Sequence, residues 1–429
     1  MIPATAPLSQ QTRHAWVLAL LLCCGSVVNY LDRAVLGVLM QPVRAALSLS
    51  NTDYGFAVNT FLVAYAVFYV VGGRLADRFG YRRTISISLA LWSLAAMAHG
   101  WARGFASLCL VRGLLGAGQG SFYPAAIRGT TEWFPGAQRA MAIGLLLAGL
   151  CVGTLITPPV AAWLFLKYGW RAAFLVTGAI SLLLLPLWSL FHRPAGRGLT
   201  RTVADTGAMS APPEDVIPLG FVLRSGKYWS AVMARALSDS AWYFYLFWLP
   251  GYFQEVRGFD AAMLGESLWI PYGAAGLGAL GGPWAAGVLI RRGVEPGRAR
   301  KTVLVASACG CVLGALAFLP GSAFALVLVC LALFAHLSWA TNIHTVITEI
   351  SPPGHTAVLY GISGATGTVL GAVAQPIIGW IVDTHGYTPA FLAAGSHYGL
   401  AAVLVIAGVG RIERIKPPPQ YHTEPAAGA

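Results

Sequence analysis

Residues 72–83 read G-G-R-L-A-D-R-F-G-Y-R-R, at the junction of two apolar segments, 54–74 and 83–102. A short basic turn between two spans of about 20 apolar residues is typical of a membrane-spanning helical hairpin. Paired glycines followed by a basic turn recur at 281–293, where the sequence is G-G-P-W-A-A-G-V-L-I-R-R-G. The recurrence predicts an all-helical membrane protein built from two related halves.

The composition supports a lipid environment. The chain has 429 residues, of which 57% are hydrophobic and 10% charged, whereas a soluble protein has roughly 25% charged residues. The formal net charge is +12, but the basic residues lie in short loops and not on one polar face. We therefore expect membrane lipid, and not nucleic acid, as the partner of this charge.

The apolar segments define the expected architecture, an all-α polytopic membrane protein of twelve transmembrane helices. They lie at 15–40, 54–74, 83–102, 106–131, 139–165, 170–192, 228–254, 263–290, 301–319, 322–349, 356–382 and 388–410. The one long connection contains prolines and scattered charges, which predicts a polar linker. The expected domains are a six-helix bundle at 1–192, the linker at 193–227, a second six-helix bundle at 228–410 and a tail at 411–429.

The loops also predict the orientation. Twenty of the 28 Lys and Arg residues fall in the termini and loops of one side, and five fall on the other side. Lys and Arg are enriched in cytoplasmic loops. We therefore expect a multi-pass protein of the inner (cytoplasmic) membrane with both termini in the cytoplasm.

The glycines and charged residues of the basic turn at 73–83 have a specific spacing. Asp77, near a helix end, can pair with basic groups or cap the next helix. The pattern predicts a latch on the cytoplasmic side, which we call the cytoplasmic latch. Its residues are Gly73, Asp77, Arg78, Gly80, Arg82 and Arg83. The alternative is a basic loop that serves only to orient the chain.

Five charged residues lie well inside the predicted membrane helices: Asp32, Arg33, Arg112, Arg235 and Asp239. Such charges cost a few kcal/mol each and are functional by default. Three are positive and two negative, so the net charge suits one anionic group. The alternative is structural pairing, in which Asp32 neutralises Arg112 and Arg235 bridges Asp239 one turn along.

The helix predicted at 106–131 carries Arg112, Gly116, Gln119 and Tyr123 at spacings that place them on one face. An arginine on such a face can make a bidentate contact with a carboxylate. Four glycines in the same segment predict close packing against neighbouring helices. These are Gly113, Gly116, Gly118 and Gly120.

Further polar residues lie on other predicted helices. Asn29, Tyr30, Asp32 and Arg33 are expected to form one polar patch, and Tyr65 lies in the middle of its helix, where it is expected to line a cavity. The helix at 322–349 carries His336, Trp339 and Asn342 at spacings of three. A tryptophan with an amide can hold a sugar ring by stacking and hydrogen bonds; the alternative is ordinary packing.

Enzyme and metal chemistry are not expected. All seven cysteines lie inside apolar segments and none has the spacing of a metal site with histidine. No set of nucleophile and base is recognisable either. The sequence thus predicts neither a metal nor a cofactor.

Several motifs resemble known families. The segment 73–83 resembles the signature of the major facilitator superfamily between its second and third helices. Further motifs look like its anion:cation symporter family, and the last two look most like the hexuronate and aldonate transporters of that family. They are N-Y-L-D-R at 29–33, R-G-L-L-G-A-G-Q-G-S-F-Y-P at 112–124, T-E-W-F-P at 131–135, G-W-R-A-A-F at 169–174, W-Y-F-Y-L-F-W-L-P-G-Y at 242–252 and H-L-S-W-A-T-N at 336–342.

The resemblance implies proton-coupled uptake of a sugar acid, a hexuronate such as galacturonate or glucuronate, or an aldonate. It implies that Asp32 carries a proton, and it implies a set of substrate contacts. These are Tyr30, Arg33, Tyr65, Arg112, Trp339 and Asn342. The family usually has glutamate where this chain has Gln119, which can hydrogen-bond a substrate hydroxyl but cannot carry a proton.

Other functions stay open at this point. Gln119 permits an uncoupled uniporter or exchanger of the same substrates, and a non-sugar carboxylate is an alternative cargo. A membrane-embedded sensor would need an output domain, which the sequence after Lys416 does not suggest. We expect a monomer whose small-molecule partner is an organic anion, with protons as the coupling ion.

Overall fold

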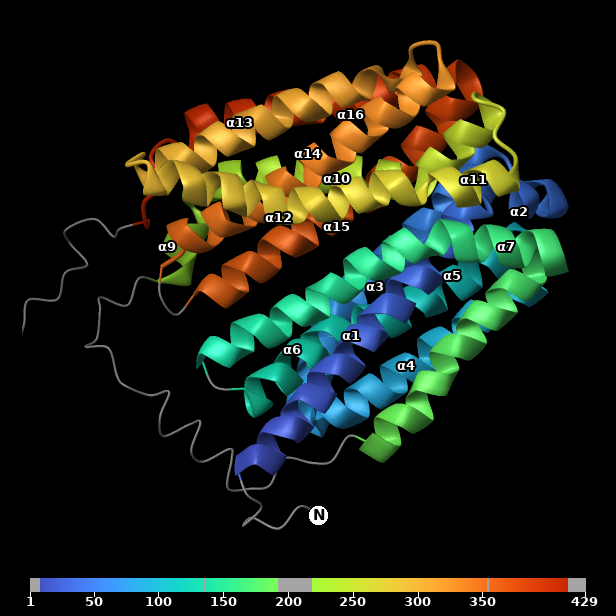
Figure 1. Ribbon diagram of the computed structural model, residues 1–429, viewed down its shortest axis with the longest axis horizontal. Coiled ribbons are helices and arrows are strands. Elements are labelled where there is room, and N and C mark those ends of the chain that lie inside the picture. Colours follow the sequence, from blue (N-terminus) through green and yellow to red (C-terminus); the bar gives the residue numbers. More distant parts are fainter. Residues whose placement is uncertain (1–7, 135, 192–217, 353–354, 416–429) are drawn as a thin grey trace, which may run out of the picture. The chain divides into compact units, whose positions relative to one another are not determined.

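The computed structural model describes residues 8–134, 136–191, 218–352 and 355–415, and within these ranges the chain forms helices and no strands (Figure 1). The helices before the long connection are α1 Leu8–Val38, α2 Met40–Leu47, α3 Asn51–Phe79, α4 Tyr81–Ala98, η1 His99–Trp101, α5 Phe105–Gly120, α6 Phe122–Trp133 and α7 Gly136–Phe191. Those after it are α9 Leu219–Leu223, α10 Gly226–Glu255, α11 Ala261–Ser267, α12 Trp269–Arg291, α13 Pro296–Gly314, η2 Ala315–Phe318, α14 Ser322–Ile350, α15 Thr356–His385, α16 Tyr387–Val403 and η3 Leu404–Val409.

These helices confirm the all-α polytopic fold. In the described part of the chain, eight helical stretches are long and apolar enough to cross a membrane. One of them, Met141–Leu190, contains two predicted spans, because α7 is broken at Gly169, whose φ of 83° lies in the left-handed region that favours glycine. Three predicted spans lie outside these eight stretches. α4 is short, the span containing α5 and α6 is divided in two, and α10 carries charged residues.

Two boundaries differ from the prediction. The helix expected at 106–131 is divided at Ser121 into α5 and α6. Residues 193–217 of the predicted linker and 416–429 of the predicted tail lie outside the described ranges. The remaining part of the linker is not all loop, because α9 forms there. Its Val222 is fully buried with Tyr228 and Leu359, and this apolar contact favours a helical turn.

The described residues pack into two compact units. The first unit comprises the described parts of Met1–Ala208 together with Phe244–Gly273 and Ala372–His385. The second unit comprises the described parts of Met209–Tyr243, Ala274–Gly371 and Gly386–Ala429. The first unit therefore holds α1 to α7, the C-terminal parts of α10 and α15, α11 and the start of α12.

Glycines allow the helices of the first unit to approach closely, as predicted. A Cβ atom at Gly116 would meet the backbone carbonyl of Phe61 on α3, and one at Gly118 would meet the backbone of Trp92 on α4. α5 is thereby pressed against both neighbours (Figure 1). Small residues at such crossings let backbones pack directly in membrane proteins.

The two sequence repeats make the same contact in the two units. Gly72 on α3 lies against Ser121, between α5 and α6, and Gly282 on α12 lies against Ser338 on α14. In both places a Cβ atom would overlap the serine. In each unit a glycine of the pair therefore allows a close helix crossing.

Candidate functional site

Arg33 on α1 is surrounded by aromatic rings and amides. Its guanidinium carbon lies 4.5 Å from the centre of the Tyr30 ring, 4.6 Å from that of Tyr65 and 5.2 Å from that of Phe61. The side chain is buried. Cation–π contacts of this kind are worth about 2 kcal/mol when they are desolvated. The structure thus brings three of the predicted residues, Tyr30, Arg33 and Tyr65, into one cluster.

Gln119 on α5 fixes the orientation of Arg33. The Nε atom of Arg33 donates to Gln119 Oε1 at 3.2 Å, and Gln119 Nε2 donates to the backbone carbonyl of Asn29 at 2.8 Å. Arg33 Nη2 also donates to Asn29 Oδ1 at 3.3 Å. A neutral amide can accept from arginine and donate to a carbonyl at the same time. Gln119 therefore lies against α1.

Arg112 on α5 is the most deeply buried cation of the first unit. Its side chain is 0% exposed, and none of its three side-chain nitrogens has a hydrogen-bond partner among the described residues. Its guanidinium carbon lies 5.9 Å from the centre of the Phe61 ring, the ring that Arg33 also contacts. A buried cation without hydrogen bonds is costly, and an anionic ligand offers the partners it lacks.

Asp32 does not pair with Arg112. The hydroxyl of Ser181 on α7 donates to Asp32 Oδ2 at 2.5 Å, and no ion pair within 4 Å joins Asp32 to Arg112. Asp32 thus makes its hydrogen bond on a different side of α1 from Arg33. Adjacent residues on a helix point about 100° apart, so Asn29 and Arg33 face α5 whereas Asp32 faces α7.

The predicted residues of α14 lie in the second unit. Trp339 is 0% exposed and its ring centre lies 6.0 Å from that of Tyr398 on α16. The amide nitrogen of Asn342 donates to the backbone carbonyl of Ser338, one turn earlier, at 2.9 Å. The indole nitrogen of Trp339 has no hydrogen-bond partner among the described residues. The two side chains are thus packed into the core of this unit.

Sequence reasoning missed several neighbours of these residues. Phe61 is shared by Arg33 and Arg112, and it lies one turn before Tyr65 on α3, so the helical spacing could have indicated it. Tyr398 also contacts His336, whose ring stacks on Trp242 with centres 4.9 Å apart. No sequence pattern connects these three, because they come from α10, α14 and α16.

One residue of the predicted cytoplasmic latch, Asp77, belongs to an ion-pair network within the first unit. Asp77 at the end of α3 pairs with Arg128 on α6, and Arg128 also pairs with Glu132 at 3.0 Å. Gly80 ends α3 with a φ of 82°. The spacing predicted a charged partner for Asp77 but could not identify it.

A second set of polar contacts joins helix ends remote from this turn, also within the first unit. The carboxylate of Asp383 on α15 accepts from the backbone nitrogens of Asn51 and Thr52 at 3.0 and 2.8 Å. These are the first two N–H groups of α3, which lack partners in their own helix. In the same unit Arg44 on α2 pairs with Glu255 on α10 at 2.6 Å. The sequence analysis assigned no role to these residues.

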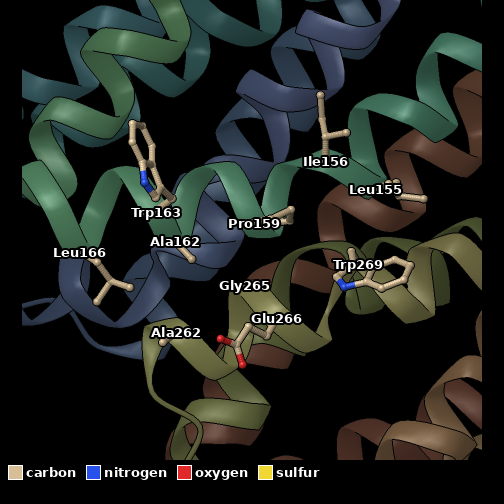
Figure 2. Close-up of a pocket in the computed structure, with 10 residues that line it drawn as sticks. All are labelled: Leu155, Ile156, Pro159, Ala162, Trp163, Leu166, Ala262, Gly265, Glu266 and Trp269. Carbon is tan, nitrogen blue, oxygen red and sulfur yellow. The ribbon is translucent and has the colours of Figure 1, made fainter.

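The groove shown in Figure 2 is not suited to an anion. It lies between α7 and the segment containing α11 and the start of α12, with a volume of about 690 Å³. Its lining is apolar apart from Glu266, and Trp163 and Trp269 are among the side chains that border it. A negative carboxylate would repel an anionic ligand, so the arginine cluster is the better candidate site.

Comparison with known proteins adds an independent observation. The sequence model described as Major Facilitator Superfamily matches residues 22–374. The hexuronate transporter of Escherichia coli K12 is 24% identical over 424 residues, covering 96% of this chain and 98% of that protein. The D-galactonate transporter of Escherichia coli O6:H1 is 26% identical, covering 96% of this chain and 99% of that protein.

A solved structure agrees with the fold. The crystal structure of a D-xylose-proton symporter superimposes with a TM-score of 0.76 at 18% identity. The superposition covers 92% of this chain and 98% of the other. At this identity the likeness concerns the fold alone.

Proposed function

The chain belongs to the Major Facilitator Superfamily, a family of transporters and not of enzymes, and we propose that it imports a sugar acid, a hexuronate or an aldonate, together with protons. The observation that carries the proposal is the arginine pair of the first unit. Arg112 is fully buried without hydrogen-bond partners, and Arg33 lies against the same Phe61 ring. A carboxylate is the ligand that this arrangement lacks.

The chemistry of guanidinium explains why a carboxylate fits. Arginine presents parallel N–H donors that match the two oxygens of a carboxylate. Each hydrogen bond to a charged group contributes about 1.5–3 kcal/mol. In the proposed complex Arg112 makes this bidentate contact, Arg33 contributes charge, and Tyr30, Tyr65 and Gln119 complete the lining of the site. Relatives that carry hexuronate and D-galactonate support a sugar acid as the cargo.

The polyol part of the substrate is proposed to contact α14. Trp339 would present an aromatic face and Asn342 an amide, which together suit a ring or chain of hydroxyl groups. Asn342 already donates to a backbone carbonyl, so its remaining capacity is mainly that of its carbonyl oxygen as an acceptor. Substrate hydroxyls are donors and match this capacity.

Asp32 is the proposed proton carrier of the first unit. It is a carboxylate with 2% exposure, and the hydroxyl of Ser181 donates to it. While it is ionised, it competes electrostatically with the substrate for Arg112. Protonation removes the competing negative charge, so proton binding and anion binding would favour each other. The proton is released on the cytoplasmic side after the substrate has crossed.

Alternating access would require the contacts at the two ends of the helices to break in turn. Asp77 with Arg128 belongs to the proposed cytoplasmic latch. The bonds of Asp383 to α3 and of Arg44 to Glu255 join the opposite helix ends. We propose that the latter set opens to admit substrate. The protein is placed in the inner membrane as a monomer with both termini cytoplasmic, following the distribution of basic loops.

An uncoupled uniporter or exchanger is the second candidate. Gln119 favours it, because an amide bonded to both Arg33 and Asn29 takes no part in proton transfer. Substrate identity is tested by counterflow in proteoliposomes that are loaded with labelled glucuronate. Unlabelled galacturonate, galactonate, acetate and succinate then compete from outside. The proposal expects the sugar acids to compete, and stronger competition by the simple carboxylates would contradict it.

A further inference from the structure

A pair of opposite charges lies in the middle of α10, in the second unit. Arg235 Nε and Asp239 Oδ2 are 3.4 Å apart, one helical turn from each other. The side chains are 10% and 22% exposed, respectively. Ideal hydrogen bonds between charged groups measure about 2.7–2.9 Å. The attraction between Arg235 and Asp239 is therefore weaker than it would be at the distance of an ideal charged hydrogen bond.

Arg235 is held mainly by α15. Its Nη1 atom donates to the hydroxyl of Ser363 at 2.7 Å and to the backbone carbonyl of Tyr360 at 3.4 Å. Its guanidinium carbon also lies 4.8 Å from the centre of the Tyr360 ring. These contacts do not depend on the charge of Asp239. The arginine can thus stay in place when Asp239 becomes neutral.

Asp239 has fewer partners. Among the described residues, Arg235 is the one group that hydrogen-bonds its carboxylate. The carboxylate lies directly against the backbone of α15 at Gly367, where a Cβ atom would overlap it. Gly364, one turn earlier, leaves similar room for Arg235, because a Cβ atom added there would lie 3.2 Å from Arg235 Nη2. The two glycines make space for an ionisable pair inside a membrane helix bundle.

The other titratable groups around the pair come from α14, α15 and α16 and from α10 itself, where Tyr228 lies within electrostatic range of Arg235. Tyr360 on α15 faces both charges, and its hydroxyl is hydrogen-bonded to Nδ1 of His344 on α14 at 3.3 Å. His344 lies within electrostatic range of Arg235. His336, further along α14, is stacked on Trp242 and bonded to Tyr398 on α16. None of these contributes a second carboxylate.

We propose that Asp239 binds a proton in each transport cycle, in addition to Asp32. This inference rests on the proposed proton-coupled function. When Asp239 is ionised, the pair with Arg235 is neutral. When it takes up a proton and becomes a carboxylic acid, Arg235 keeps its charge and its bonds to α15. The positive charge is then free to balance an anion, so a proton and an anion enter together without a change in local net charge.

The experiment measures the proton-to-substrate ratio in proteoliposomes, from pH-dye and label uptake recorded together. With two protons and one monoanion, each cycle moves one positive charge, so an inside-negative potential accelerates wild-type uptake. Asp239→Asn is expected to lower the ratio by one and to abolish the acceleration by potential. With a gradient of one pH unit, the limiting accumulation should fall about tenfold.

Two controls separate this role from a structural one. The double variant Arg235→Gln/Asp239→Asn removes both charges and leaves no unpaired cation; it should exchange substrate and still show the lower ratio. Glu349→Gln breaks the pair of Glu349 with Arg300 in the same unit and should keep the wild-type ratio. An unchanged ratio in Asp239→Asn, or its return in the double variant, would overturn the proposal. Wild-type uptake that ignores the proton gradient would instead show that the proposed coupling fails.

Discussion

Replacing Arg112 by methionine should weaken substrate binding while making the substrate-free protein more stable. The two effects have one cause. Arg112 is fully buried, and none of its side-chain nitrogens is hydrogen-bonded within the described residues. In the absence of an anion the guanidinium is an uncompensated charge, and in its presence the guanidinium is the principal partner of the carboxylate. Methionine fills a comparable volume without the charge.

The magnitudes follow from the contacts. Two hydrogen bonds to a charged group are worth at least about 3 kcal/mol, which corresponds to roughly a hundredfold increase in Kd. Replacing a buried charge by a well-packed apolar side chain can stabilise a protein by about 1–4 kcal/mol. The Kd of Arg112→Lys should lie between those of the wild type and Arg112→Met, because lysine keeps the charge but not the paired donors.

The assay is thermal unfolding of purified protein, with and without glucuronate at a saturating concentration. For the wild type, ligand at 100 times its Kd should add about 2.7 kcal/mol of stability. The Met variant should have the higher Tm without ligand and a much smaller shift with it, because the same ligand concentration is then about equal to its Kd and adds about 0.4 kcal/mol. Arg103→Met, at an exposed loop position, is the control and should behave as the wild type. A lower ligand-free Tm for Arg112→Met would refute the reasoning.

The remaining predictions concern other parts of the chain. Gly116→Val should abolish folding, because the valine side chain would meet a backbone carbonyl of α3. The readout is loss of the monodisperse peak in size-exclusion chromatography. Gly113→Ala is the control and should be tolerated, because the atom nearest to its new Cβ lies at 3.4 Å. Asp77→Asn should slow uptake with an unchanged Tm, since its pair with Arg128 is exposed and worth about 0–1 kcal/mol; a matching drop in Tm would argue for a structural pair. Glu295 accepts from the backbone nitrogens of Gly297 and Arg298 at the start of α13, which lowers its pKa. The stability that Glu295 contributes is present above its unfolded pKa and is lost as pH falls through its folded pKa. The Tm deficit of Glu295→Gln should therefore disappear in acid. A Tm deficit that is independent of pH would contradict this.

The fold could be predicted because membrane helices follow from length and hydropathy, and because paired glycines indicate close helix crossings. Gly72 and Gly282 each contact a serine of a neighbouring helix. The division of one span at Ser121 could not be predicted. Neither could α9, which depends on Val222 packing against residues distant in the sequence. Such tertiary contacts override local propensity.

The site was predictable where helical spacing decides it. The spacing singled out Gln119 as a polar residue of its helix, and the structure shows that it bonds Arg33. The direction of Asp32 does not follow from its place beside Arg33, because a helix separates adjacent residues by about 100°. The partner of Asp32 is Ser181, which is 149 positions away in the chain. Contacts of this range require the structure.

Coupled accumulation is the most direct test of the proposed function. Wild-type protein would be reconstituted in proteoliposomes, and uptake of labelled galacturonate and glucuronate measured with and without an inward proton gradient. The account predicts accumulation above the outside concentration that disappears when the gradient is collapsed. Equilibration that ignores the gradient, or no uptake of either acid, would contradict it.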